Sequence, residues 1–457
     1  KELPTANCQL PTVMYLLYSF LLTLACVALL PYFAWQAVFK RKYLNNLAQR
    51  LGRLPAAWRD DGRPTLWLHA VSVGETLAVL PLLKALHAQF PQHRLIVSTT
   101  TATGQQVARD RAVEADGVCY FPFDWRFAVR RALAAIKPQA VILMESELWP
   151  NFLAECRAQQ LPVAVVNGRI SDRSLKRSRR VRWLLAPVYR NVTRFLMQST
   201  ADAERAVALG ANESSVSVSG NLKYDLGAYG LSAQQEAVAR ELNDRYALSN
   251  APLIIAGSTT EGEEPLVLEA FRALRQSHAN VRLLLAPRHP ERFASVASLL
   301  ADTHWKIARR SEQLLAPEAM PNADVILLDS IGELAALYQF ASVVFVGGSL
   351  VPKGGHNILE PALYGKPIIV GPHTENFRAI VEEFLRRDAV LQLAVLAEWP
   401  EELAEALTEA LAEAFQRLLT DTAYAQRLGQ HAQQTVAANR GATARTVEAI
   451  ASLLRCA

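Results

Sequence analysis

The stretch Val346-Gly-Gly-Ser-Leu-Val-Pro-Lys-Gly-Gly-His-Asn-Ile-Leu-Glu-Pro361 carries the strongest indication of the fold. The β-branched and aromatic run 341–346 leading into it predicts a buried strand. Residues 358–364 predict a helix that ends at the Gly-Lys-Pro sequence 365–367. A strand, a glycine-rich loop and a helix start direct free backbone N–H groups at one point, and the helix dipole helps them bind an anion. This arrangement favours a nucleotide-phosphate site over an ordinary strand–turn–helix connection.

Several residues of this loop suit a bound nucleotide. Glycines allow the main chain to approach a ligand where a Cβ atom would collide. Lys353 and His356 can supply cationic or hydrogen-bonding groups, and Asn357 can cap the helix. Glu360, about one turn into the helix, is placed to accept hydrogen bonds from vicinal hydroxyls such as those of a ribose. The predicted nucleotide-binding residues of the loop are Gly348, Ser349, Lys353, Gly354, Gly355, His356, Asn357 and Glu360.

Length and composition indicate two domains and a reducing compartment. A chain of 457 residues is too long for one core, and two domains of about 200 residues are the natural division. The formal net charge of +5 is modest. The cysteines are scattered, with no CxxC pair and no histidine at metal-ligand spacing, so neither a disulfide framework nor a zinc site is indicated. They are Cys8, Cys26, Cys119, Cys156 and Cys456.

The N-terminal segment predicts a membrane anchor at residues 1–39. No charged residue occurs from 3 to 39, and a Lys-Arg-Lys run follows at 40–42. The segment is long enough to cross a hydrocarbon core of ~30 Å, which takes ~20 residues. Tyr32, Trp35 and Tyr43 suit an interfacial belt, and the basic flank predicts that the following domain is cytoplasmic. A cleaved signal peptide is disfavoured because the apolar run is too long. The anchor either spans the membrane or lies in one leaflet.

Beyond the anchor, short apolar strands alternate with amphipathic helices. Strands are expected at 65–71, 95–99, 118–121, 140–145, 163–167 and 195–198, and in a second series at 252–256, 281–286, 325–328, 343–346 and 368–370. This alternation predicts α/β domains with parallel, doubly wound sheets whose ligand sites lie at the carboxyl ends of the strands. The division is an N-terminal domain at 40–225, a linker at 226–250, a C-terminal domain at 251–435 and a C-terminal helix at 436–457 that can cross back. Two Rossmann-like halves facing each other across a cleft follow from it.

A candidate catalytic base lies in the Val-Ser-Val-Gly-Glu-Thr sequence 71–76. This sequence follows a predicted strand and begins a predicted helix, so Glu75 is expected at the carboxyl edge of the first sheet. A carboxylate there can accept a proton from an attacking hydroxyl if its pKa suits the task. The alternative is a glutamate that stabilises a helix N-terminus.

Two further strand ends of the first domain carry polar side chains. Thr101 and Thr103 in the sequence Thr-Thr-Thr-Ala-Thr-Gly at 99–104 can bind sugar hydroxyls, although helix capping explains part of this pattern. Glu145 lies in the sequence Met-Glu-Ser-Glu-Leu-Trp-Pro-Asn at 144–151, which combines two carboxylates with a tryptophan. All three residues are predicted to bind a substrate.

A basic segment follows the strand expected at 163–167. Seven basic side chains lie between positions 169 and 182, more than a solvated helix face needs. They suit phosphates on a ligand, anionic lipid headgroups or nucleic acid. The neighbouring anchor favours a phosphorylated lipid, and basic and aromatic residues do not interleave as in single-strand-binding proteins, so no nucleic acid partner is expected. The residues predicted to bind this phosphorylated lipid are Arg169, Arg173, Lys176, Arg177, Arg179 and Arg180.

Strand ends in the second domain extend the nucleotide site. Ser258 and Thr259 belong to the sequence Gly-Ser-Thr-Thr-Glu-Gly-Glu-Glu at 257–264, and Arg288 and His289 follow the next strand. All converge with the glycine-rich loop on the same sheet edge, so we predict that these four residues bind the nucleotide. No Asp-x-Asp sequence occurs, and no His, Cys and carboxylate cluster has metal spacing. The charge of a departing phosphate is therefore expected to be neutralised by protein groups.

The motifs VSVGE, TTTATG, MESELWPN, NGRISDRS, GSTTEGEE, PRHPER and GGSLVPKGGHNILEPALYGKPIIVGPHTENF together resemble those of bacterial 3-deoxy-D-manno-octulosonic acid (Kdo) transferases. The resemblance covers nearly the whole chain in the family's order. It implies a two-domain GT-B glycosyltransferase that moves Kdo from CMP-Kdo to the 6′-hydroxyl of a lipid A precursor at the cytoplasmic face of the bacterial inner membrane. It also implies an inverting reaction without a metal or cofactor, with Glu75 as the base. The implied partners are CMP-Kdo, the lipid A precursor and inner-membrane lipids. The resemblance thus makes CMP-Kdo the donor, bound by the candidate residues of the second domain, and the lipid A precursor the acceptor, bound by those of the first.

Two other classes of function are weighed against the transferase. A nucleotide-sugar epimerase uses the same double fold but needs neither a membrane anchor nor a basic acceptor helix. A membrane-tethered nucleotide sensor needs no base at Glu75.

Overall fold

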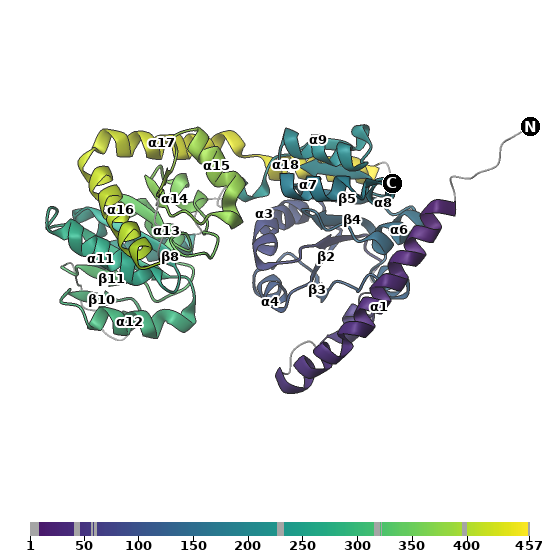
Figure 1. Cartoon of the computed structure of the whole chain (residues 1–457), viewed down its shortest axis with the longest axis horizontal. Helices are drawn as coiled ribbons and strands as arrows, with labels where there is room; N and C mark the ends of the chain where they lie inside the picture. Colours follow the sequence, from purple (N-terminus) through teal and green to yellow (C-terminus); the bar gives the residue numbers. More distant parts are fainter. Residues whose placement is uncertain are drawn as a thin grey trace, which may run out of the picture. The chain divides into compact units, whose positions relative to one another are not determined.

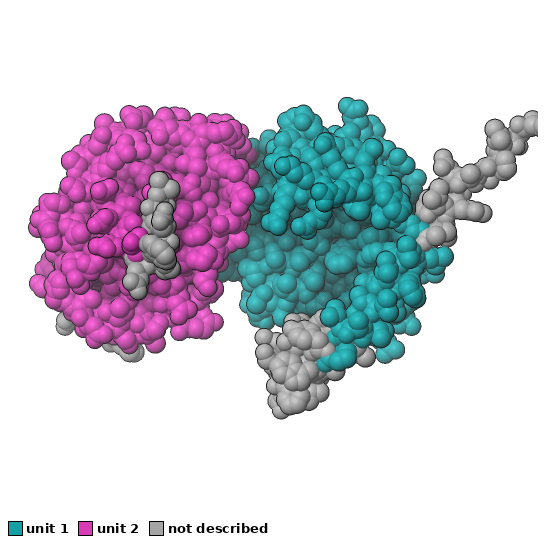
Figure 2. Space-filling model, viewed as in Figure 1, with its two compact units in different colours: residues 1–225, 440–457 teal, residues 226–439 magenta. Residues whose placement is uncertain are grey.

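The computed structural model of the chain describes residues 9–40, 46–55, 58, 62–225, 233–314, 320, 322–394 and 400–455. The chain divides into two compact units (Figure 2). Unit 1 comprises residues 1–225 and 440–457, and unit 2 comprises residues 226–439. Each unit contains a seven-stranded sheet in which all paired strands are parallel. The predicted α/β class with parallel sheets is confirmed.

The sheet of unit 1 has the strand order β3-β2-β1-β4-β5-β6-β7. Its strands β2, β3, β4 and β5 are labelled in Figure 1. Its strands are β1 (Thr65–His69), β2 (Arg94–Thr99), β3 (Gly117–Tyr120), β4 (Pro138–Met144), β5 (Val163–Gly168), β6 (Arg194–Met197) and β7 (Val216–Val218). The order reverses between β1 and β4, and in open parallel sheets ligands bind at the carboxyl ends beside such a reversal.

Helices cover both faces of this sheet because successive side chains of a strand point to opposite faces. The helices of unit 1 are α1 (Gln9–Lys40), α2 (Leu47–Arg50), α3 (Val73–Gln89), α4 (Ala102–Arg111), α5 (Arg126–Ile136), α6 (Pro150–Ala158), α7 (Asp172–Arg179), α8 (Arg182–Tyr189), α9 (Thr200–Leu209) and α18 (Ala442–Arg455). Leu66 and Leu68 of β1 share a core with α3, α4 and α18, whereas Trp67 shares one with α5, α6, α8 and α9. The C-terminal helix α18 therefore completes the core of unit 1.

The helix α1 lies against unit 1 through one of its faces. Hydrogen bonds to the rest of unit 1 include those between Tyr15 and Asn191 (2.8 Å), Ser19 and Asn151 (2.9 Å), and Thr23 and Trp125 (3.1 Å). Positions 15, 19 and 23 recur at the spacing of one helix face. Among the described residues, no helix is both long and apolar enough to span a membrane. The first eight residues of the predicted anchor and the basic residues after Lys40 lie outside the described residues.

The sheet of unit 2 has the strand order β10-β11-β9-β8-β12-β13-β14. Its strands are β8 (Leu253–Thr259), β9 (Arg282–Pro287), β10 (Ile307–Arg309), β11 (Val325–Leu327), β12 (Val343–Val346), β13 (Ile368–Val370) and β14 (Leu391–Gln392). Its helices are α10 (Ala233–Tyr246), α11 (Glu263–Arg275), α12 (Phe293–Ala301), α13 (Leu334–Leu337), α14 (Leu359–Leu363), α15 (Arg378–Arg386), α16 (Pro400–Thr420) and α17 (Thr422–Asn439). The order reverses between β8 and β12, where the motifs beginning at 257 and 347 lie.

The unit boundaries differ from those expected from the sequence. Most of the predicted linker is structured, because α10 occupies positions 233–246 and belongs to unit 2. Residues 226–232 lie outside the described residues. The chain returns to unit 1 at residue 440, not 436. The carboxylate of Asp225 accepts hydrogen bonds from the N–H groups of Gly441 (2.8 Å) and Thr443 (2.6 Å). These bonds join the segment that leaves unit 1 to the segment that returns to it.

Candidate functional site

Glu75 lies in the first turn of α3, at the carboxyl end of β1. Its carboxylate accepts hydrogen bonds from the Val71 N–H (2.9 Å) and the Ser72 hydroxyl (2.9 Å), and the Ser72 side chain accepts one from the Glu75 N–H (3.4 Å). These contacts form a helix-capping arrangement. Glu75 therefore stabilises the N-terminus of α3, and any catalytic role is additional to this structural one.

The environment of Glu75 also tunes its acidity. Burial raises the pKa of Glu75 to about 6; the Val71 and Ser72 hydrogen bonds lower it, and the nearby carboxylates of Glu145 and Glu147 raise it further. A carboxylate with a pKa near neutrality suits general-base catalysis, because it is deprotonated at the working pH and still basic enough to take a proton. Burial also raises the pKa of Glu147. Glu75 and Glu145 are thus close enough for their charges to interact.

The two predicted threonines differ in what they can offer. Thr101 caps α4: its hydroxyl accepts a hydrogen bond from the Gly104 N–H (3.1 Å) and donates one to the Val71 carbonyl (3.2 Å). That hydroxyl is therefore used within the protein, which is the capping alternative. Thr103 is exposed on the first turn of α4, and its hydroxyl makes no hydrogen bond with the described part of the chain. Of the two, Thr103 is the one free to bind a sugar hydroxyl.

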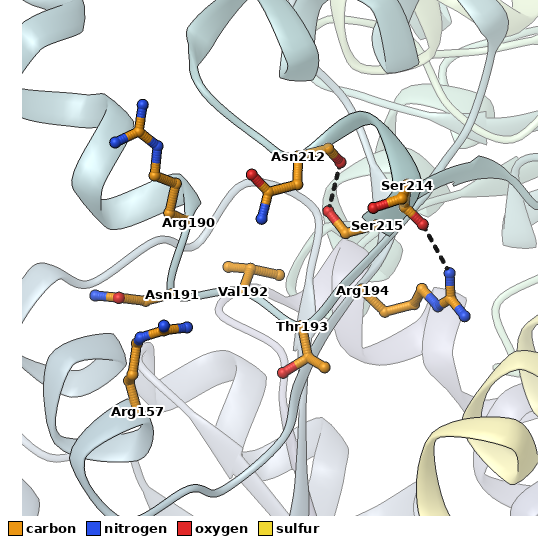
Figure 3. Close-up of a pocket in the computed structure, with 9 residues that line it drawn as sticks. All are labelled: Arg157, Arg190, Asn191, Val192, Thr193, Arg194, Asn212, Ser214 and Ser215. Carbon is orange, nitrogen blue, oxygen red and sulfur yellow. Dashed lines mark hydrogen bonds between the residues drawn. The ribbon is translucent and has the colours of Figure 1, made fainter. Parts of the chain in front are cut away.

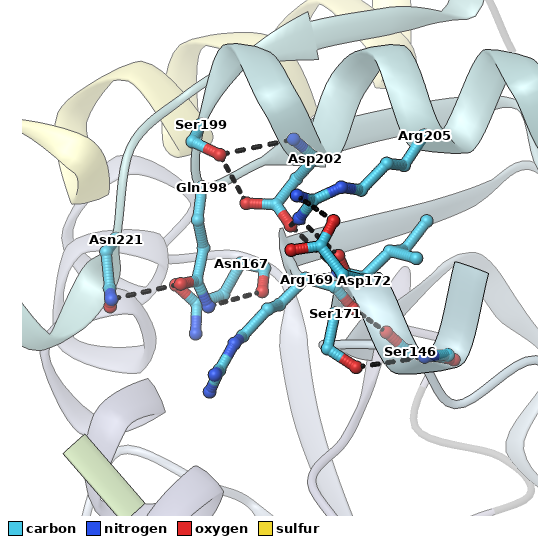
Figure 4. A network of polar contacts seen from close by, with 12 residues as sticks. Ser146, Asn167, Arg169, Ser171, Asp172, Gln198, Ser199, Asp202, Arg205 and Asn221 are labelled. Atoms are coloured by element: carbon cyan, nitrogen blue, oxygen red, sulfur yellow. Dashed lines mark hydrogen bonds and ion pairs between the residues drawn. The ribbon is translucent and has the colours of Figure 1, made fainter. Parts of the chain in front are cut away.

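A polar network follows β5 and β6 at the same edge (Figure 4). Asn167 accepts a hydrogen bond from the Leu222 N–H through Oδ1 (3.0 Å) and one from Gln198 through its backbone carbonyl (3.0 Å). Gln198 in turn accepts one from Asn221 (3.0 Å). The side chain of Arg169 extends away from the contacts that surround Asp202 (Figure 4). Arg169 could be predicted from the sequence, whereas Gln198 and Asn221 could not, because the loops that hold them carry no recognisable motif.

The basic helix α7 has no buried residue. Its acidic residue Asp172 pairs with Arg205 of α9 (2.6 Å). By contrast, none of the predicted basic residues after Asp172 makes an ion pair or hydrogen bond through its side chain within the described chain; these are Arg173, Lys176, Arg177, Arg179 and Arg180. Their charges therefore remain available to an external anion.

In unit 2, the four strand-end residues predicted to bind the donor lie at the carboxyl ends of the adjacent strands β8 and β9. Ser258 has a left-handed backbone (φ 57°), as do Glu145 (φ 55°) and Asn167 (φ 55°) in unit 1. Such strained residues cluster at functional sites. Thr259 is fully buried, and its hydroxyl donates a hydrogen bond to Glu264 (3.0 Å). Its side chain therefore stabilises the strand end and is not exposed to a ligand. Arg288 and His289 are exposed.

The carboxylate of Glu263 organises the first half of the glycine-rich loop. Glu263 is fully buried at the start of α11. It accepts hydrogen bonds from the N–H groups of Thr260 (2.8 Å), Gly348 (2.7 Å), Ser349 (2.9 Å) and Leu350 (2.9 Å), and from the Thr260 hydroxyl (3.1 Å). The Ser349 hydroxyl donates to the Val346 carbonyl and accepts from Gly371 N–H (2.9 Å). The N–H groups of Gly348 and Ser349, expected to face the ligand, are therefore occupied by a carboxylate of the protein.

The second half of the loop keeps its donors available. The N–H groups of Gly354, His356 and Asn357 make no hydrogen bond within the described residues, whereas that of Gly355 donates to the Gly348 carbonyl (2.7 Å). Gly354 (φ 89°) and Gly355 (φ 73°) have left-handed backbones, which favour glycine. The helix that follows, α14, has only five residues and is shorter than predicted. Anion binding would therefore rely on individual N–H groups and side chains more than on a helix dipole.

His356 is a neutral hydrogen-bonding group here. Burial lowers the pKa of His356 to about 4, and the positive charges of Arg288 and His289 lower it further. Its Nε2 atom is buried and has no hydrogen-bond partner in the described chain. A Cβ atom on Gly348 would lie 2.8 Å from this ring, so the glycine makes room for it. His356, Arg288 and His289 are thus brought together, and an orphaned buried nitrogen suits a bound ligand.

Asn357 donates a hydrogen bond to Glu360 (3.1 Å) and accepts one from the Leu359 N–H (3.0 Å) at the start of α14, although Ile358, not Asn357, occupies the N-cap position. Lys353 is exposed. In the described part of the chain, no group of three or more His, Cys, Asp or Glu side chains is placed to hold a metal ion. Cys26, Cys119 and Cys156 are free thiols there.

Comparisons with known proteins first define the class. UDP-GlcNAc 2-epimerase from Neisseria meningitidis bound to UDP-GlcNAc is similar in structure, with a TM-score of 0.55 over 86% of this chain and 100% of that one, at 13% identity. The fold is therefore a two-domain, GT-B-like α/β fold. Because an epimerase has this fold, the fold alone does not distinguish an epimerase from a glycosyltransferase.

Sequence comparisons decide the family. A family model for 3-deoxy-D-manno-octulosonic-acid transferase (kdotransferase) matches residues 45–226. The 3-deoxy-D-manno-octulosonic acid transferase of Haemophilus influenzae is 33% identical over 94% of this chain and 96% of its own length. That of Bordetella pertussis is 36% identical over 88% and 90%. The chain belongs to the 3-deoxy-D-manno-octulosonic acid transferase family and is a glycosyltransferase, as its motifs indicated.

Proposed function

We propose that this enzyme transfers Kdo from CMP-Kdo to the 6′-hydroxyl of a lipid A precursor, with inversion at the anomeric carbon and without a metal ion. Family membership supports Kdo as the transferred sugar. The observation that carries the mechanism is the half-buried carboxylate of Glu75, whose pKa is raised by burial to about 6 at the carboxyl edge of unit 1.

In this mechanism Glu75 accepts the proton of the acceptor hydroxyl. The oxygen forms a bond to the anomeric carbon of Kdo on the face opposite the CMP, and the bond from that carbon to the phosphate oxygen breaks. CMP leaves with the electron pair. The growing charge on the phosphate is stabilised by the N–H groups of Gly354 and Asn357 and by the side chains of Arg288 and Lys353. Preorganised donors of this kind supply much of an enzyme's rate enhancement. Glu360 is assigned to the CMP ribose.

A turnover assay with CMP-Kdo and a tetra-acylated lipid A precursor tests this function. Only a transferase makes the Kdo–lipid product, whereas an epimerase or a nucleotide sensor leaves the acceptor unchanged. Mass spectrometry of the product also counts the Kdo units added.

We place the enzyme at the cytoplasmic face of the inner membrane, with α1 embedded in one leaflet. The face of α1 that does not contact unit 1 exposes large apolar side chains, each about half or more exposed: Leu16, Leu17, Phe20, Leu21, Leu24, Val27 and Leu29. Exposed apolar clusters of this kind mark lipid or protein contacts, and basic residues near a lipid surface strengthen such contacts.

Transfer activity is expected to survive excess EDTA. In the proposed mechanism Arg288, Lys353 and loop N–H groups stabilise the charge of the departing phosphate, so removing divalent ions should leave the rate unchanged. The rate is compared in chelator and after magnesium is added back. A loss in EDTA that magnesium restores would contradict the metal-free mechanism.

Replacing Arg177, Arg179 and Arg180 with Ser should raise the acceptor KM by ~10-fold or more, at roughly 1 kcal/mol per basic residue near an anionic surface. The motivation is that these exposed arginines have no partner in the described chain, while a lipid A precursor offers phosphates to their guanidinium groups. Acceptor kinetics, CMP affinity and melting temperature are measured on one preparation. CMP affinity and melting temperature should not change. A weakened CMP site with an intact acceptor KM would assign the helix to the donor.

A further inference from the structure

A basic pocket lies at the amino-terminal edge of the unit 1 sheet, opposite the edge that carries Glu75. It has a volume of about 390 Å³ and forms where α6 ends and where β6 and β7 begin (Figure 3). Its lining includes Arg157, Arg190, Asn191, Thr193, Arg194 and Ser214. Arg157 and Arg190 lie on one side of the pocket and Arg194 on the other (Figure 3). None of the predicted acceptor or donor residues belongs to it.

The positive charge of this pocket is not compensated. No Asp or Glu lines it. The side chains of Arg157 and Arg190 make no ion pair or hydrogen bond with the described part of the chain, and that of Arg194 donates to the Ser214 carbonyl (3.1 Å). Glu155 of α6 is already paired with two other arginines, at 2.6 and 2.7 Å. Three guanidinium groups around one cavity repel each other, so an anion bound there would be stabilised.

The polar groups of the pocket suit a phosphate. A guanidinium group binds phosphate oxygens through two parallel hydrogen bonds. The Thr193 hydroxyl accepts from the Val163 N–H (3.1 Å) and keeps its own hydrogen to donate. The volume falls in the range of small-molecule sites and leaves room for more than a phosphate group alone.

The pocket adjoins α1. Asn191 lines it and also donates a hydrogen bond to Tyr15 of α1 (2.8 Å), directly before the exposed apolar residues that begin at Leu16. We propose that the pocket binds the phosphate of an anionic glycerophospholipid headgroup while the apolar face of α1 contacts the acyl chains. The proposal rests on the membrane association proposed above. It adds a lipid site that is separate from the acceptor's phosphates and from the basic helix α7.

The test compares two double variants of the full chain. Arg157→Gln with Arg190→Gln removes two exposed charges from the pocket. The matched control, Arg109→Gln with Arg111→Gln, removes two exposed charges from α4, which packs on the other face of the same sheet. Sedimentation with vesicles is measured for phosphatidylcholine alone and for phosphatidylcholine with phosphatidylglycerol, at physiological salt. The pocket variant should bind the anionic vesicles at least about fivefold more weakly than the control, with no difference on neutral vesicles.

Equal weakening in both variants, or none in the pocket variant, would overturn the proposal. Calorimetry with inorganic phosphate separates the two sources of phosphate. If the pocket variant loses phosphate binding but keeps vesicle binding, the pocket serves a free phosphate and the lipid assignment is wrong. Wild-type protein that binds neither vesicle would instead refute the membrane association itself. Kdo transfer in detergent micelles should be equal in all three proteins, and a loss confined to the pocket variant would assign the pocket to the reaction.

Discussion

Replacing Glu75 with Gln is expected to lower the rate of Kdo transfer by roughly 10²–10⁴-fold, the usual contribution of a general base, while CMP affinity stays unchanged. Glutamine keeps the size of the side chain and one oxygen that can accept from the Val71 N–H (2.9 Å in the wild type), so most of the helix cap survives. Proton acceptance is what it loses. Single-turnover rates and CMP titrations on the same preparation measure the two effects separately. Near-normal turnover of the variant would show that Glu75 acts only as a helix cap.

The pH profile of the wild-type enzyme offers an independent check. Burial raises the pKa of Glu75 to about 6, and a base acts only when deprotonated. The rate should therefore be low below this pH and rise to a plateau above it. Glu147→Gln removes one of the two nearby charges that raise this pKa, so it should move the midpoint to lower pH while the plateau stays the same. A wild-type rate that does not change between about pH 5 and 8 would contradict the assignment.

The central strands of both sheets could be predicted from the sequence because each is a short apolar run, and such runs are typical of buried strands. β1, β4, β8 and β12 are examples that are buried or nearly so along their length. The strands that were missed, β7, β10 and β14, have two or three residues each and lie at sheet edges. Edge strands are partly exposed, so no apolar run marks them. The linker was misplaced because α10 is polar enough to resemble a loop in sequence.

The sequence predicts which strand ends carry the candidate site residues better than it predicts which of their groups remain free to bind a ligand. Parallel strands bring their carboxyl ends to one edge, so glycines, cations and carboxylates at strand ends had to gather there. Which groups remain free depends on contacts distant in sequence. Glu263 binds the N–H groups of residues 348–350, more than 80 positions away. No local pattern distinguishes this buried carboxylate from its exposed neighbour Glu261. In the same way, nothing local indicated that His356 would be neutral.

Glu263→Gln is expected to weaken CMP binding by about tenfold or more and to lower the stability of unit 2. In the wild type, the two carboxylate oxygens accept from four backbone N–H groups and one hydroxyl. Glutamine replaces one oxygen with an NH₂ group, which cannot accept, so buried N–H donors lose their partner. Each buried donor left unsatisfied costs roughly 1–3 kcal/mol. The glycine-rich loop should then no longer be held in the conformation that presents Gly354 and Asn357.

The matched control is Glu261→Gln, which makes the same change two residues earlier at an exposed position. CMP affinity is measured well below the melting temperature, together with circular dichroism, so that a loss of binding is not mistaken for unfolding. The melting transition of unit 2 should fall by about 10 °C, given ~2–4 °C per kcal/mol for a unit of this size. The control should match the wild type in both measurements. A Glu263→Gln variant with wild-type CMP affinity and melting temperature would show that the loop holds its shape without this carboxylate, and the donor site would then have to be explained by the glycines alone.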